Sequence, residues 1–124
     1  MPKENRVLVI IPAYNEQDTI IEVIKNIPRS IEGIASVTVA VIDDGSTDNT
    51  VSLVKSETEA LVISHNQNRG VGTAFRTGLD YALKSRVDIM VNIDADGQFD
   101  PVDIPKWIRP SVADEADFVT ASRF

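Results

Sequence analysis

The chain has 124 residues, of which 43% are hydrophobic and 25% are charged, a composition typical of one soluble globular domain with its own core. Its formal net charge of −7 argues against a general nucleic-acid-binding protein, and the absence of cysteine excludes disulfides, thiolate metal sites and cysteine nucleophiles. No apolar run is long enough to span a membrane and the first residues do not resemble a signal peptide, so a cytoplasmic location fits the composition.

Strand-like and helix-like patterns alternate along the sequence. Apolar, β-branched runs predict strands at residues 6–11, 37–42, 60–64, 87–93 and 116–121. Apolar residues at helical spacing predict the connecting helices, from an Asn15 cap to Ile27, from about residue 47 to 56, from 70 to 84, and from Asp100 to just before Pro110. Strands that alternate with helices predict an α/β domain with a mostly parallel sheet covered on both faces.

Polar residues follow each of the first two predicted strands. The segment Pro12-Ala13-Tyr14-Asn15-Glu16 is either a strand stop before a helix cap, or a ligand-binding loop with Tyr14 as a stacking surface and Glu16 as an acceptor. The segment Asp43-Asp44-Gly45-Ser46-Thr47-Asp48 is either a well-capped turn, or a site where one acid accepts a hydrogen bond from a nucleobase or ribose. Position alone leaves both alternatives open.

The segment Asn68-Arg69-Gly70-Val71-Gly72 opens the clearest predicted helix, whose apolar stripe consists of Val71, Ala74, Phe75, Gly78, Leu79 and Ala82. Helix N-termini and nearby arginines favour phosphate, so Arg69 is either a phosphate ligand or an exposed loop residue. Arg123, after the last predicted strand, has the same two interpretations. His65, the only histidine, is predicted to be a polar loop residue, and Trp107 to pack the short helix against the sheet.

The most informative segment is Asp94-Ala95-Asp96-Gly97-Gln98, which directly follows the apolar run 89–93. Side chains alternate along an extended chain, so positions 94, 96 and 98 share one face if the strand geometry continues. Three oxygen-bearing groups on one face suit a hard divalent cation such as Mg²⁺ or Mn²⁺. Because α/β sheets bind ligands at the carboxyl ends of their strands, this segment predicts the functional site.

Three other motif interpretations fit less well. Gly70–Phe75 begins like a dinucleotide-binding fingerprint, but Phe75 stands where the third glycine belongs. Asp94–Gly97 is similar to the first motif of haloacid-dehalogenase phosphatases, but Gln98 stands where they usually have Thr or Val, and too little chain follows for their other motifs. A calcium-binding EF-hand loop would need glycine at the position of Phe99.

Together, these segments resemble family 2 glycosyltransferases of the GT-A fold. The matching segments are Ile11–Glu16, Val41–Asp48, Asn68–Ala74 with Gly78, Asp94–Gln98 and Ala121–Phe124. Each match is modest alone, but their shared order and spacing cover nearly the whole chain. The Asp-Ala-Asp-Gly-Gln form is most similar to that of polyprenyl-phosphate (dolichol-phosphate-type) mannosyl- or glucosyltransferases. The resemblance implies a three-layer, Rossmann-like α/β fold with a mostly parallel central sheet, forming one nucleotide-sugar-binding domain over residues 1–124.

The resemblance also implies roles for individual residues. The residues that would line the nucleotide pocket are Pro12, Tyr14, Glu16, Asp43, Asp44, Arg69, Asp94 and Ala95. Asp94 and Asp96 would be the catalytic residues, and Asp94, Asp96 and Gln98 would bind Mg²⁺ or Mn²⁺. Arg69 and Arg123 would lie near the diphosphate.

The implied activity is metal-dependent transfer of a sugar from a UDP- or GDP-sugar to an acceptor such as polyprenyl phosphate, with inversion, in cell-envelope polysaccharide or glycolipid biosynthesis. Family members continue past the Ser122-Arg123-Phe124 segment into an acceptor-binding half, sometimes with membrane helices. We therefore expect this chain to be the donor-binding half of a protein at the cytoplasmic face of a membrane, with little transfer by itself. The alternatives are a nucleotide-sugar-binding module without turnover and, less well supported, a dehalogenase-type phosphatase.

Overall fold

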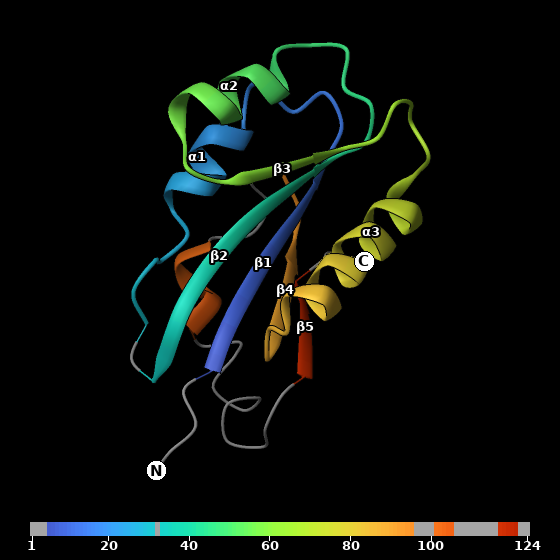
Figure 1. Cartoon of the computed structure of the whole chain (residues 1–124). Helices are drawn as coiled ribbons and strands as arrows, with labels where there is room; N and C mark the ends of the chain where they lie inside the picture. The colour runs from blue at the N-terminus through green and yellow to red at the C-terminus, as the bar shows by residue number, and fades with distance from the viewer. Residues whose placement is uncertain (1–4, 32, 96–100, 106–116, 122–124) are drawn as a thin grey trace.

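The computed structural model describes residues 5–31, 33–95, 101–105 and 117–121. In chain order its elements are β1 (Asn5–Ala13), α1 (Ile20–Lys25), β2 (Ile34–Asp43), α2 (Thr50–Glu57), β3 (Leu61–Ser64), α3 (Val71–Ser85), β4 (Ile89–Ile93), the 3₁₀ turn η1 (Pro101–Asp103) and β5 (Asp117–Ala121) (Figure 1). The five strands form one sheet in the order β3-β2-β1-β4-β5, and every neighbouring pair is parallel. The prediction of an α/β domain with a parallel sheet is confirmed.

Strand β1 is the centre of the sheet. It pairs with β2 from Asn5 to Ala13 and with β4 from Val7 to Ile10. Helices α1 and α2 lie on one face of the sheet and α3 lies on the other (Figure 1). Because both faces are covered, the residues of β1 from Val7 to Ala13 are all apolar, and residues 7–11 are fully buried.

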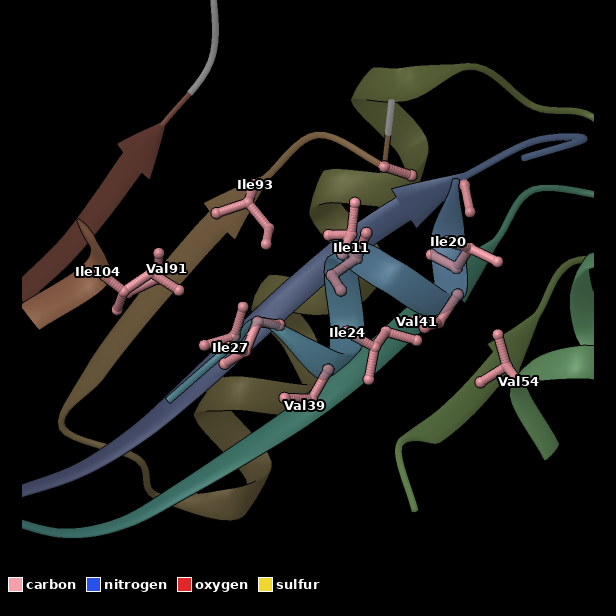
Figure 2. Close-up of a cluster of buried hydrophobic side chains, with 14 of the residues drawn as sticks. Ile11, Ile20, Ile24, Ile27, Val39, Val41, Val54, Val91, Ile93 and Ile104 are labelled. Atoms are coloured by element: carbon pink, nitrogen blue, oxygen red, sulfur yellow. The ribbon is translucent and has the colours of Figure 1, made fainter. Parts of the chain in front are cut away.

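Side chains of β1 alternate between two apolar clusters. Val9 and Ile11 belong to the cluster under α1 and α2, whereas Leu8 and Ile10 belong to the cluster under α3. Figure 2 shows part of the first cluster, with Ile11, Ile20, Ile24, Ile27, Val39, Val41, Val54, Val91, Ile93 and Ile104 labelled. Full burial of a Val, Leu or Ile side chain contributes roughly 1.5–3 kcal/mol, so these two clusters are a main source of stability.

Helix α3 packs very closely on the centre of the sheet. Its buried small residues Ala74, Gly78 and Ala82 recur at every fourth position and therefore lie on one helix face. A Cβ atom at Gly78 would stand 2.5 Å from Ile10 Cδ1, so the missing side chain sets how near α3 approaches β1. Val71 differs from the predicted stripe, because it is 75% exposed in the first turn of the helix.

Strand β1 runs through Pro12 to Ala13, although Pro12 was expected to stop it. The ladder with β4 ends at Ile10, so β1 has one partner strand beyond that residue. A residue without an N–H group is tolerated there, as it is at a sheet edge. The described part of η1 agrees with the short helix predicted from Asp100, whereas Trp107 and the predicted end near Pro110 lie outside the described residues.

The prediction that Asn15 caps a helix is wrong. Helix α1 begins at Ile20 after Thr19, and Asn15 itself has a left-handed φ of 53°. The Asn15 Oδ1 atom instead accepts hydrogen bonds from the backbone N–H groups of Thr47 (2.8 Å) and Asp48 (3.3 Å). Helix α2 begins at Thr50 rather than near residue 47, where it was predicted to start.

Among the helices of the described part of the chain, none is both long and apolar enough to cross a lipid bilayer.

Replacing Gly78 by Ala should lower the free energy of unfolding by about 1–3 kcal/mol, because the new methyl group forces fully buried Ile10 to move. Gly72→Ala is the matched control in the same helix, where nothing lies within 4 Å of an added Cβ. There the better helix propensity of Ala should leave stability unchanged or raise it by up to about 1 kcal/mol. Urea unfolding of both variants measures the difference, and equal effects would contradict the proposed close contact.

Candidate functional site

A cavity of about 320 Å³ opens where β1, β2 and β4 end, beside the first turn of α3. This volume falls in the range of small-molecule binding sites. The residues that line it are Pro12, Ala13, Tyr14, Glu16, Asp44, Val71, Ala74, Asn92, Asp94 and Ala95. Three carboxylates and one amide line the cavity together with apolar groups, so its polar lining is rich in hydrogen-bond acceptors.

The loops after β1 and β2 are joined by reciprocal hydrogen bonds. The Asn15 N–H donates to Ser46 Oγ (2.8 Å), and the Glu16 N–H donates to Thr50 Oγ1 (2.9 Å). In the other direction, the Thr47 N–H donates to Asn15 Oδ1. These bonds fix the loop that carries Tyr14 and Glu16 relative to the end of β2.

Asp44 is held in the cavity wall by several hydrogen bonds. It is 5% exposed, and its backbone N–H donates to the Ala13 carbonyl (2.8 Å). Its Oδ1 contacts His65 Nδ1 (2.8 Å) and accepts from the Arg69 N–H (2.9 Å), while Oδ2 accepts from the Gly70 N–H (2.8 Å). Burial alone would raise the pKa of Asp44, but these hydrogen bonds outweigh it and hold the pKa below its ordinary value. Asp44 is therefore an ionised acceptor at neutral pH.

Asn92 and Asp94 occupy alternate positions at the end of β4 and both line the cavity. Asn92 is 8% exposed, and its Oδ1 atom is buried without a hydrogen-bond partner among the described residues. Such an acceptor is costly to leave unpaired, and a ligand with an O–H or N–H group would satisfy it. Ala95 is held in place because its carbonyl accepts a hydrogen bond from Thr19 Oγ1.

The predicted metal ligands are described only in part. Asp94 lines the cavity, whereas Asp96 and Gln98 lie outside the described residues. In the described ranges, no group of three His, Asp or Glu side chains is arranged to hold a metal ion. The carboxylate of Asp94 is an oxygen donor of the kind that Mg²⁺ and Mn²⁺ prefer, so the described part of the predicted ligand set fits such an ion.

Most of the predicted nucleotide-pocket residues lie together around the cavity. These are Pro12, Tyr14, Glu16, Asp44, Asp94 and Ala95. Asp43 does not line it: strand alternation places Asp43 on the face of Val39 and Val41, and its Oδ2 accepts from the Ser46 N–H (3.2 Å). Arg69 is exposed and does not line the cavity either, although its backbone N–H bonds to Asp44. Arg123 lies outside the described residues.

Two polar residues of the site were missed by the sequence interpretation. Asn92 was counted as part of an apolar run, although a single amide in a buried strand, two residues before Asp94, is itself a signal. His65 was predicted to be a polar loop residue, but its side chain is 10% exposed and contacts Asp44. No local pattern indicates that contact, because its two partners are 21 residues apart.

Comparison with known proteins connects this geometry to one family. A model of glycosyl transferase family 2 matches residues 8–124, including the Asp94–Gly97 segment that is similar to a phosphatase motif. The UDP-N-acetylglucosamine–dolichyl-phosphate N-acetylglucosaminyltransferase of Methanococcus voltae is 36% identical over 133 residues. That alignment covers 94% of this chain and 51% of the relative, so the chain spans about half the relative's length.

Two solved glycosyltransferase structures have the same fold. Glucosyl-3-phosphoglycerate synthase from Mycobacterium tuberculosis, solved with Mn²⁺, uridine diphosphate and glucosyl-3-phosphoglycerate, matches with a TM-score of 0.69 and 28% identity, over 87% of this chain and 40% of that chain. A mannosyltransferase from Pyrobaculum calidifontis, solved with GDP-Man and Mn²⁺, matches with a TM-score of 0.65 and 33% identity, over 82% and 30% of the two chains. The predicted GT-A fold is confirmed.

Replacing Asn92 by Leu should raise the free energy of unfolding by about 1 kcal/mol or more, because it removes a buried acceptor that lacks a partner. Asn26→Leu, at an exposed position just after α1, is the control and should change stability little. Thermal or urea unfolding measures both. A loss of stability in Asn92→Leu would mean that the Oδ1 atom has a partner in solution.

The lowered pKa of Asp44 predicts an acid-sensitive contribution to stability. Since the folded-state pKa lies below the unfolded value of about 3.9, the contribution is complete above that pH and is lost as the pH falls through the folded-state pKa. Asp44→Asn should therefore show a shallower loss of stability below about pH 4 than the wild type. Urea midpoints measured at several pH values test this, with Asp80→Asn on the exposed side of α3 as control; parallel curves for wild type and Asp44→Asn would contradict it.

Proposed function

The chain belongs to glycosyl transferase family 2, and from this membership we propose that it is the donor-binding half of a glycosyltransferase. In the proposed reaction, a sugar passes from a UDP- or GDP-sugar to an acceptor, with inversion at the anomeric carbon. The nucleotide would occupy the cavity at the carboxyl ends of β1, β2 and β4.

One observation carries this proposal: carboxylates from strands on opposite sides of β1 line a single cavity. Asp44, after β2, is suited to the base or ribose, because its Oδ2 accepts a single N–H, from Gly70, and can accept another. The exposed side chains of Tyr14 and Val71 add surface against which a base can pack. Asp94, after β4, is suited to the opposite end of the nucleotide.

We place the diphosphate at the end of β4. Asp94, with Asp96 and Gln98, would hold a Mg²⁺ or Mn²⁺ ion, which when bound would stabilise the charge of the leaving nucleoside diphosphate. Arg69 and Arg123 would interact with the same phosphate groups. The two solved relatives support this choice of ligand, since each was determined with Mn²⁺ and a uridine or guanosine diphosphate compound.

We propose a polyprenyl phosphate as the acceptor, because the Methanococcus voltae relative is named for transfer to dolichyl phosphate. An ionised phosphate could attack the anomeric carbon from the face opposite the diphosphate without a strong general base. The chain matches 51% of that relative, so we assign acceptor recognition and any membrane attachment to the other half. A second candidate function is a module that binds the nucleotide sugar without turning it over, because the cavity with its carboxylates suits binding by itself.

Thermal unfolding with UDP, GDP, CDP or dTDP, each with and without Mn²⁺, tests nucleotide binding. We expect at least one nucleotide to raise the unfolding midpoint, because a ligand at 100 times its Kd stabilises the folded state by about 2.7 kcal/mol. We expect Mn²⁺ to raise that midpoint further, because the ion would bind between Asp94 and the diphosphate. Asp94→Asn should remove most of the Mn²⁺-dependent part, whereas Asp80→Asn, outside the cavity, should not.

Failure of all four nucleotides to shift the midpoint would contradict the proposed function. Equal Mn²⁺ dependence in wild type and Asp94→Asn would contradict only the metal site. Sugar transfer measured with an acceptor then separates the enzyme from the binding module.

A further inference from the structure

The side chains of Asp44, His65 and Thr77 form a continuous chain of contacts behind the cavity. His65 Nδ1 lies 2.8 Å from Asp44 Oδ1, and His65 Nε2 lies 2.8 Å from Thr77 Oγ1. The side chains of His65 and Asp44 are only 10% and 7% exposed. Because the three residues come from the end of β2, the end of β3 and the middle of α3, the imidazole connects three elements.

Hydrogen accounting determines which nitrogen of His65 donates to Asp44. An ionised carboxylate only accepts, so the contact with Asp44 requires a hydrogen on Nδ1. On the other side, Thr77 Oγ1 also lies 3.1 Å from the Thr73 carbonyl, to which its hydroxyl can donate. If the Thr77 hydroxyl donates to Thr73, its oxygen accepts from Nε2–H, and the ring carries hydrogens on both nitrogens. If the hydroxyl instead donates to Nε2, the ring is neutral and carries its hydrogen on Nδ1. Both arrangements keep the donor at Nδ1.

The result of this contact is a fixed orientation of the Asp44 carboxylate. Oδ1 is occupied by His65 and by the Arg69 N–H, whereas Oδ2 is bonded to the Gly70 N–H alone. A carboxylate oxygen has two acceptor positions, so the remaining capacity lies on Oδ2. Rotation of the carboxylate would break the His65 bond and both backbone bonds together.

The loop that carries these donors is itself held against the end of β2. The His65 N–H donates to the Asp43 carbonyl (2.8 Å). Gly45 has a left-handed φ of 81°, and a Cβ there would stand 2.6 Å from the carbonyl carbon of Gln67 and 2.7 Å from the nitrogen of Asn68. The loop therefore packs directly on Gly45, and the backbone of His65 is fixed next to Asp44.

We propose that His65 is a positioning residue of the nucleotide pocket: backed by Thr77, its Nδ1–H holds Asp44 so that Oδ2 faces the ligand. This inference rests on the proposed function, since it concerns the nucleotide that would occupy the cavity. His65 acts through Asp44 and does not line the cavity itself. The pocket then selects ligands that present an N–H or O–H group at that point.

The first test uses the fact that His65 is the only histidine of the chain, so its imidazole signals need no assignment. Long-range ¹⁵N–¹H correlation spectra of the nucleotide-free protein at neutral pH report which ring nitrogens carry hydrogens. The expected result is a hydrogen on Nδ1. A ring that is neutral with its hydrogen on Nε2 alone would overturn the proposal, whatever the outcome of the binding experiments.

The second test compares nucleotide affinity in matched variants, with the best nucleoside diphosphate of the thermal panel and Mn²⁺. His65→Leu should weaken binding about tenfold or more, as expected for loss of a hydrogen bond to a charged group. His65→Asn places an amide N–H near the Nδ1 position and should restore most of the affinity. Thr77→Val, which removes only the backing hydroxyl, should have a smaller effect, and Asn66→Ala in the exposed part of the loop should have none.

A double-mutant cycle excludes a merely structural role. In the Asp44→Asn background, His65→Leu should cause little further loss of affinity, because the two residues act as one unit. Wild-type binding that is unchanged in His65→Leu, or no rescue by His65→Asn, would overturn this inference and leave the proposed function standing. Absence of nucleotide binding by the wild type would overturn both, and circular dichroism of each variant confirms that it is folded.

Discussion

The site depends on one buried, ionised carboxylate. Asp44 loses most of its hydration at the end of β2, and hydrogen bonds from His65 and the backbone of residues 69 and 70 replace the lost water. These donors come from a single loop, so the charge of Asp44 and the position of that loop stabilise each other. The start of α3, which follows the loop, is thereby fixed over the cavity.

The position of the cavity follows from strand geometry. Side chains alternate along β2, so the adjacent acids Asp43 and Asp44 face opposite layers: Asp44 lines the cavity, and Asp43 holds the turn at Ser46. The same alternation along β4 puts Asn92 and Asp94 on the cavity side. Two neighbouring carboxylates of identical chemistry therefore have different surroundings, and only one of them is placed to meet a ligand.

The sequence was sufficient to predict the five strands, the presence of helices between the first four, and the edge of the sheet at which they bring polar residues together. The spacing of apolar residues indicates which face of an element a residue occupies, and turn residues indicate where a strand ends. Both signals come from neighbouring residues in the sequence. The cross-loop bond of Asn15 and the contact between His65 and Asp44 were not predicted, because each joins residues more than twenty positions apart. Asn92 was missed for a different reason: its neighbours made the strand look uniformly apolar. The roles given to Asp96, Gln98 and Arg123 remain predictions, since these residues lie outside the described part of the chain.

A crystal structure of this chain grown with Mn²⁺ and a nucleoside diphosphate tests the central claim most directly. The expected result is density for the nucleoside in the cavity between Asp44 and Asp94, with a donor group on Asp44 Oδ2 and an anomalous Mn²⁺ peak beside Asp94. Ligand density elsewhere with this cavity empty, for example at the second hollow beside Lys25 and Arg29, would contradict it.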